Sequence, residues 1–207
     1  MASMERMGEM SERLLQPGDR APNVVLDAIS RQGQIAINDF RGQKPLLIGL
    51  FRGLHCPFCR RHLAVQAAID RTLREKGVEC IAVVNTPIDR ARLYLRYHPL
   101  PDLLAASDPE RASHRAFGLP NLDLAEVQSG LQRKIAVVAT AALNTWDGYK
   151  MTEVDQQMAQ EGGGQLFGQF LIDREGIIRW SFTEVADRML ERPNPHDLLE
   201  AASQVSA

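Results

Sequence analysis

The chain has 207 residues and a formal net charge of −2, and 44% of its residues are hydrophobic and 24% charged. This length suits one good-sized α/β domain, and the near-neutral balance favours neither nucleic acid nor an anionic membrane as a partner. No stretch approaches the roughly 18 uninterrupted apolar residues of a transmembrane helix, and residues 1–12 lack the apolar run of a secretory signal. We therefore expect a cytoplasmic protein with no membrane and no nucleic-acid partner.

The first sixteen residues differ from the rest of the chain. Residues 4–15 predict a short polar helix, and Pro17 and Gly18 end it. No internal repeat or low-complexity tract divides the remainder of the chain. The sequence therefore predicts a helical N-terminal extension over residues 1–16 and a single domain over residues 17–207.

The domain begins with β structure. Two short β runs, residues 24–26 and 34–37, lie on either side of a turn and predict a hairpin. Residues 45–51 read PLLIGLF and are apolar throughout, which is typical of a central strand covered on both faces. This run ends at Gly53, directly before a pair of cysteines.

The middle of the chain alternates helices and strands. Apolar residues recur at helical spacing after Pro57, and Gly77 suits the position just past the end of that helix. The next elements are predicted as strand, helix, strand and helix, at residues 78–85, 86–97, 103–106 and 107–117. Such alternation indicates parallel strand pairing.

The last third of the chain is less regular. Residues 121–164 predict only one or two helices and a loop. Two β runs, residues 167–172 and 177–182, form a predicted hairpin, and residues 195–205 form a last helix with Pro195 in its first position. The fold class is therefore α/β, with a mixed central sheet flanked by helices on both faces.

The cysteines are the residues most able to carry chemistry. Three cysteines, Cys56, Cys59 and Cys80, are too few for a disulfide scaffold in a chain of this length. One C-x-x-C pair also cannot supply four zinc ligands by itself, so we expect no metal and no cofactor. Cys80 lies inside a predicted strand, where an inert buried thiol is expected.

Cys56 lies where a buried strand gives way to a helix that starts at Pro57. Near the N-cap, free backbone N–H groups and the helix dipole favour thiolate over thiol. Arg52, Arg60 and Arg61 are expected to add positive potential. Cys56 is therefore the predicted nucleophile, with a pKa below the roughly 8.5 of a free thiol.

Cys59 lies three positions further on, so its sulfur is expected beside that of Cys56, where it can close a reversible disulfide. Pro57 supports an early helix start. Arg52 and His55 are expected to support the thiolate or orient a substrate; the alternatives are a surface salt bridge and a solvated loop histidine. A stabilised thiolate predicts a redox potential less negative than the thioredoxin value of about −270 mV.

Residues 51–66 read FRGLHCPFCRRHLAVQ and resemble the thioredoxin-like superfamily. With the PGDRAP opening and the segments SDPERASHRAFGL and FGQFLIDREGIIRWSF, the chain is most similar to the peroxiredoxin-like (AhpC/TSA, redoxin) branch. The resemblance implies a thioredoxin-like fold, redox chemistry without a cofactor, a thioredoxin- or glutathione-like thiol donor, and a disulfide or peroxide substrate. It leaves a homodimer open.

The chain departs from the peroxiredoxin pattern at several positions. Gly53 and Gly49 stand where those enzymes carry a Thr and a Pro, and neither Phe167 nor Gly168 supplies their Arg. A cis-Pro typical of thioredoxins is also missing near this point. These departures weaken the match to a peroxidase site.

Three functions remain open from the sequence. The first is a thiol–disulfide oxidoreductase that cycles Cys56 and Cys59. The second is a thiol-dependent peroxidase in which Cys56 forms a sulfenic acid and Cys59 resolves it. The third is a non-enzymatic redox-sensing module. The missing Thr favours the first function, whereas the overall resemblance favours the second.

Overall fold

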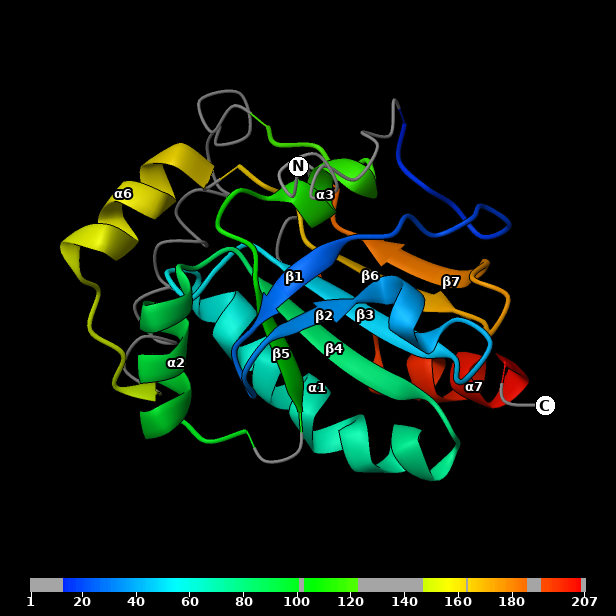
Figure 1. The fold of residues 1–207 in the computed structure, drawn as a ribbon. Coiled ribbons are helices and arrows are strands. Elements are labelled where there is room, and N and C mark those ends of the chain that lie inside the picture. Colours follow the sequence, from blue (N-terminus) through cyan, green and yellow to red (C-terminus); the bar gives the residue numbers. More distant parts are fainter. Residues whose placement is uncertain (1–12, 101–102, 123–146, 163, 186–190, 206–207) are drawn as a thin grey trace.

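The computed structural model describes residues 13–100, 103–122, 147–162, 164–185 and 191–205. Within them lies a seven-stranded sheet in the order β2-β1-β5-β4-β3-β6-β7 (Figure 1). The strands are β1 (Val25–Ala28), β2 (Gln34–Ala36), β3 (Leu46–Phe51), β4 (Glu79–Val84), β5 (Leu104–Ser107), β6 (Gly168–Ile172) and β7 (Ile178–Thr183). The helical elements are η1 (Ile37–Phe40), α1 (Pro57–Glu75), α2 (Ile88–Tyr97), α3 (Ala112–Ala116), α6 (Glu153–Gly162) and α7 (Pro195–Val205).

The sheet is mixed, as the sequence predicts. Strands β3, β4 and β5 pair in parallel, whereas β1 with β2, β1 with β5, β3 with β6 and β6 with β7 pair antiparallel. Every residue of β3 is buried, which fits its uninterrupted apolar sequence. Parallel strands require crossover connections, and α1 and α2 provide them.

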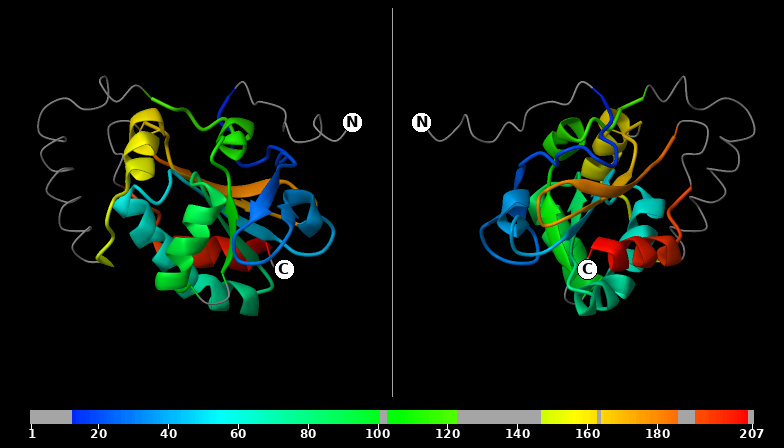
Figure 2. Two further views of the ribbon diagram at one scale, coloured as in Figure 1. Left: turned by 60° about the vertical axis from the view of Figure 1, so that its left-hand side comes forward. Right: turned by 90° about the vertical axis from the view of Figure 1, so that its right-hand side faces the viewer.

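Two hydrophobic cores lie on opposite faces of the sheet. One contains buried residues of α1, α2 and α7, including Leu63, Tyr94 and Leu198. The other contains the β1–β2 hairpin together with Ala116 of α3 and the adjacent Phe117. Helices therefore cover both faces, although three of the longer ones share one face, as the turned views show (Figure 2). None of the described helices is both long and apolar enough to cross a bilayer.

Two predicted helix boundaries were wrong. Residues 13–15 are irregular rather than helical. Leu15 N donates a hydrogen bond to Phe117 O (3.1 Å) instead of to a helical partner. The rest of the predicted N-terminal helix lies outside the described residues. Helix α3 begins at Ala112 and not at 107. The Asp108 carboxylate accepts bonds from the N–H groups of Ala112 and Ser113 (2.9 and 2.8 Å), so the preceding residues form a turn that Asp108 caps.

Within the region 121–164, the structure describes residues 121–122, 147–162 and 164. Its described helix is α6, which meets the expectation of at least one helix here. The Asp155 carboxylate accepts hydrogen bonds from the backbone N–H and the hydroxyl of Thr152, both at 2.8 Å, just before α6 begins. The first of these contacts satisfies the N–H of Thr152 at the start of a helix that sequence periodicity does not mark.

Candidate active site

Cys56 is the N-cap residue of α1, as the strand-to-helix junction predicts. Its backbone is extended (φ −88°, ψ 111°), and Pro57 occupies the first position of the helix. Cys56 Sγ accepts a hydrogen bond from Cys59 N (3.3 Å), the contact that a capping Ser or Asp oxygen makes elsewhere. A negative sulfur at this position gains both from that N–H group and from the positive end of the helix dipole.

The two sulfurs of the C-x-x-C pair lie 3.1 Å apart, and both cysteines are buried. The hydrogen bond from Cys59, together with Arg52 and Arg192, lowers the pKa of Cys56 well below its ordinary value and outweighs burial. Burial and the negative Cys56 raise the pKa of Cys59 well above its ordinary value. The surroundings of the pair therefore favour a negative charge on Cys56 and a proton on Cys59.

Arg52 lies against this pair in a buried ion-pair network. Its guanidinium donates two hydrogen bonds to the Glu184 carboxylate, at 2.9 and 3.1 Å. Glu184 also accepts from Arg192 Nη1 (2.6 Å) and from Phe167 N (3.0 Å). Two guanidinium groups therefore share one carboxylate beside the Cys56 sulfur. The predicted alternative of a surface salt bridge for Arg52 was wrong, since the residue is only 5% exposed.

Two residues of this network, Arg192 and Glu184, were not predicted from the sequence. Arg192 precedes α7, and its guanidinium lies 4.8 Å from the ring centroid of Phe167. The Arg192 guanidinium therefore lies against Phe167, near the position where the peroxiredoxin pattern carries an arginine, although residues 167 and 168 are not arginines. No spacing in the sequence links Arg192 or Glu184 to the cysteines, because the link is made by the loops around β6 and β7.

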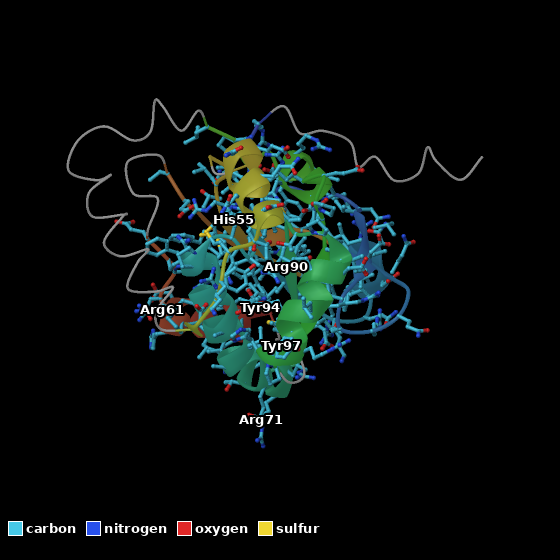
Figure 3. All side chains as sticks on the ribbon, turned by 90° about the vertical axis from the view of Figure 1, so that its left-hand side faces the viewer. His55, Arg61, Arg71, Arg90, Tyr94 and Tyr97 are labelled. Atoms are coloured by element: carbon cyan, nitrogen blue, oxygen red, sulfur yellow. The ribbon has the colours of Figure 1, made fainter. Side chains whose placement is uncertain are left out.

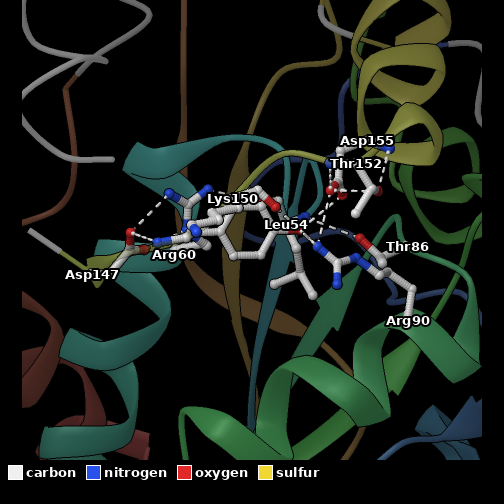
Figure 4. A network of polar contacts seen from close by, with 9 residues as sticks. Leu54, Arg60, Thr86, Arg90, Asp147, Lys150, Thr152 and Asp155 are labelled. Atoms are coloured by element: carbon white, nitrogen blue, oxygen red, sulfur yellow. Dashed lines mark hydrogen bonds and ion pairs between the residues drawn. The ribbon is translucent and has the colours of Figure 1, made fainter. Parts of the chain in front are cut away.

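Arg60 and Arg61, which were expected to add positive potential at Cys56, are not among the main causes of its lowered pKa, although the charge of Arg60 helps to lower the pKa of His55. Arg61 is exposed on α1 (Figure 3). Arg60 is buried, but its guanidinium binds the Asp147 carboxylate and Leu54 O and lies 4.0 Å from the ring centroid of Tyr149. The negative Asp147 offsets its charge. Arg60 therefore anchors the segment before α6 to α1 (Figure 4).

His55 is 8% exposed, so the alternative of a solvated loop histidine was wrong. Neither ring nitrogen has a hydrogen-bond partner among the described residues. Burial lowers the pKa of His55, which favours a neutral ring directly before Cys56. Figure 3 shows His55 near the ends of α1 and α6.

The two glycines that replace the Thr and Pro of the peroxiredoxin pattern are explained by close packing. Gly53 has φ +144°, and a Cβ there would lie 2.8 Å from Asn85 O. A Cβ on Gly49 would lie 2.5 Å from Gln66 Oε1. A threonine hydroxyl beside Cys56 is therefore incompatible with this backbone.

Cys80 lies inside β4 and is 1% exposed, as expected of a structural thiol. Burial, reinforced by Asp70, raises the pKa of Cys80 well above its ordinary value. Across the described part of the chain, no three His, Cys, Asp or Glu residues are grouped so as to hold a metal ion.

A pocket of about 210 Å³ adjoins the candidate site. Arg52 and His55 line it on the side of the dithiol, and Asn85 lines it at the end of β4. The turn before α3 and one side of α6 complete its walls. A bound group in this pocket would lie next to the residue that precedes Cys56.

Comparison with known proteins gives one family and many solved structures. The model of the AhpC/TSA family matches residues 17–181. No curated protein matches the chain in sequence. A peroxiredoxin-like protein from Aquifex aeolicus aligns with a TM-score of 0.64 at 16% identity, covering 95% of this chain and 91% of its own.

Two further solved structures are named for different redox reactions. The reduced 2-Cys peroxiredoxin of Plasmodium vivax aligns with a TM-score of 0.61 at 12% identity, covering 91% of this chain and 80% of its own. A putative thiol:disulfide interchange protein DsbE from Chlorobium tepidum aligns with a TM-score of 0.58 at 18% identity, covering 93% and 98%. At these identities the likeness shows the thioredoxin-like fold and not the substrate.

Proposed function

The chain belongs to the AhpC/TSA family, and from that premise we propose that it is a thiol–disulfide oxidoreductase that cycles Cys56 and Cys59 between dithiol and disulfide. The observation that carries this proposal is that the pKa values of the two cysteines are shifted in opposite directions. Cys56 has the lowered pKa of a nucleophile, while Cys59, 3.1 Å away, holds the proton.

In the proposed reaction, the Cys56 thiolate attacks one sulfur of a disulfide substrate R–S–S–R. A mixed disulfide forms and the first RS⁻ leaves and takes up a proton. Cys59 then loses its proton and attacks Cys56 Sγ, which releases the second RS⁻. The protein dithiol is oxidised to a disulfide and the substrate is reduced to two thiols; a thiol donor, thioredoxin- or glutathione-like, reverses these steps on the protein.

The pKa of Cys59 sets the order of these steps. Part of its elevation comes from the negative charge on Cys56. Once Cys56 is neutral in the mixed disulfide, that part is removed, and Cys59 becomes a better thiolate at the moment when it is needed. Arg52 and Arg192 remain beside the pair to stabilise the new negative charge.

A second candidate is a thiol-dependent peroxidase, which the family membership supports. Here Cys56 would attack a hydroperoxide to give a sulfenic acid and an alcohol or water, and Cys59 would condense with the sulfenic acid and release water. The two arginines beside Cys56 could stabilise the leaving oxygen. The absence of a hydroxyl at Gly53 favours the disulfide reaction over this one.

Stopped-flow kinetics on the reduced protein tests the choice. We expect Cys56 to react faster with a small disulfide than with hydrogen peroxide, each at the same concentration. A faster peroxide reaction with steady turnover would select the peroxidase. A Cys59→Ser trap that captures a single cellular partner, with no turnover of either substrate, would instead indicate a redox sensor.

A further inference from the structure

The pocket beside His55 contains a buried amide without a partner. Asn85 is 3% exposed, and neither Oδ1 nor Nδ2 has a hydrogen-bond partner among the described residues. Buried polar groups are almost always paired, and an unpaired one in a pocket indicates a ligand or water that completes it. A side-chain amide offers one acceptor and a donor side by side, so its full complement is another amide.

The position of the Asn85 amide shows which side of the pocket lies near Cys56. Asn85 directly follows β4, and its carbonyl oxygen is the atom that a Cβ on Gly53 would approach most closely. His55 also lines the pocket and immediately precedes Cys56. A peptide amide bound at Asn85 therefore lies beside the segment that carries the nucleophile.

The size and walls of the pocket suit a short peptide. Its volume of about 210 Å³ is smaller than the roughly 300–1,000 Å³ typical of sites for drug-sized ligands, yet far larger than two peroxide oxygens require. Apolar Pro87 and Met158 and charged Arg111 and Glu161 line it together. This mixture matches the apolar stems and charged ends of a small peptide.

Helix α6 forms a fixed wall of the pocket. Arg111 Nη1 donates to Glu161 O (3.0 Å) near the end of α6, and Arg90 binds Asp155 (3.0 Å) near its start (Figure 4). A helix held at both ends limits the room for a folded protein substrate, which would need an open groove. The wall therefore favours a small molecule over a protein loop.

We propose that this pocket binds a short peptide thiol or disulfide, and that Asn85 pairs with the peptide amide next to the reacting cysteine of that substrate. This inference rests on the proposed oxidoreductase function and adds its substrate class. The chemistry is the exchange described above: the peptide disulfide is reduced to two peptide thiols while Cys56 and Cys59 become a disulfide.

The first test compares two disulfides that differ in amide content. Glutathione disulfide carries peptide amides, and hydroxyethyl disulfide carries none. We expect Asn85→Leu, which is similar in volume but cannot pair, to lower the ratio of kcat/KM for glutathione disulfide to that for hydroxyethyl disulfide about tenfold. The same substitution at the exposed Asn38 should leave the ratio unchanged. An unchanged ratio in Asn85→Leu overturns the proposal.

A second variant guards against misfolding of Asn85→Leu. Val154 lies on α6, lines the pocket and is 46% exposed, so Val154→Trp narrows the pocket without disturbing a core. It should also lower the ratio at least fivefold, and a ratio equal to wild type contradicts the proposal. If Asn85→Leu slows reduction of insulin disulfides but not of glutathione disulfide, the pocket serves proteins and the small-peptide assignment is wrong.

A binding experiment tests the pocket independently of the proposed oxidoreductase function. S-Methylglutathione carries the peptide amides but no reactive thiol, so its binding needs no redox chemistry. We expect the reduced wild-type protein to bind it and Asn85→Leu to bind at least fivefold more weakly. Absence of binding to wild type overturns the pocket assignment even if hydroxyethyl disulfide is reduced. Failure to react with any disulfide overturns the proposed function, whatever the result of the binding experiment.

Discussion

Cys56 and Cys80 are both buried, at 7% and 1% exposure, yet their pKa values are shifted in opposite directions. At the start of α1, a hydrogen bond from Cys59 and two nearby arginines outweigh the cost of burying a negative sulfur. Inside β4, the charge with the largest effect on Cys80 is the carboxylate of Asp70, which adds to that cost. Burial alone therefore does not decide which thiol reacts; the charges and donors around it do.

The backbone contributes to the same difference. Cys56 precedes a helix whose first N–H groups have no partner within the helix, and one of them, at Cys59, points to Cys56 Sγ. Cys80 is paired with Leu47 in the parallel ladder between β3 and β4, where backbone groups serve the sheet. A helix start offers free donors to a sulfur, whereas a central strand offers none.

The largest expected effect comes from removing the Cys56 sulfur, and removal of the Cys80 sulfur is its control. Cys56→Ser should lower disulfide turnover at least a thousandfold, because a serine hydroxyl is not ionised at neutral pH. Cys80→Ala should retain turnover within about twofold and lose about 1 kcal/mol of unfolding free energy from the small cavity. Steady-state kinetics and urea unfolding measure both. Comparable losses of turnover in the two variants would remove the distinction between the two regions.

The second effect concerns the charge beside Cys56. Arg52→Met should raise the pKa of Cys56 by about 1–2 units, since an opposite charge at close range shifts a pKa by this much. The pH dependence of alkylation gives the value. Arg61→Met, which removes an exposed arginine from the same helix, is the matched control and should change nothing.

Arg52→Lys adds a test of mechanism to this pair. It keeps the positive charge but loses the two-pronged contact with Glu184, so it should restore part of the shift. An equal pKa in Arg52→Met and Arg52→Lys would mean that geometry, and not charge, sets the acidity of Cys56.

The third effect is on the redox potential of the couple. Stabilising the reduced form makes a dithiol more oxidising, so we expect a potential less negative than the thioredoxin value of about −270 mV. Equilibration with glutathione buffers measures it. A potential at or below that value would show that the disulfide gains more from its fit to the turn than the thiolate gains from its surroundings.

The smallest effect is expected at Arg192. It contributes less than Arg52 to the acidity of Cys56. Arg192→Met should raise the pKa of Cys56 by less than about 1 unit, because Arg52 remains paired with Glu184. Alkylation against pH again reports the change, and a larger shift than that of Arg52→Met would reverse the assigned order of the two arginines.

Much of the difference between the settings of Cys56 and Cys80 could be predicted from the sequence. The apolar run of β3, the C-x-x-C at its end and Pro57 fix a strand-to-helix junction, because each is a local signal. The inert setting of Cys80 is predicted in the same way from its place in an apolar run. The boundary of α3 could not be predicted, since the side chain of Asp108 decides it.

The electrostatic partners of Cys56 required the structure. Arg60 and Arg61 are near Cys56 in sequence, but one is bound to Asp147 and the other is exposed. Arg192 and Glu184 are far away in sequence, and both lie between the end of β7 and the start of α7. Sequence proximity predicts helix contacts well and ion pairs between distant loops poorly.

The central claim, that Cys56 alone is an acidic nucleophile, is tested most directly by alkylating all three cysteines of the reduced protein as a function of pH. Mass spectrometry then gives the rate at each position. We predict that Cys56 reacts first, that its rate falls only below a midpoint lying under the roughly 8.5 of a free thiol, and that Cys80 stays unmodified until the protein unfolds. A Cys56 midpoint at or above the free value, or modification of folded Cys80 at a similar rate, would contradict it.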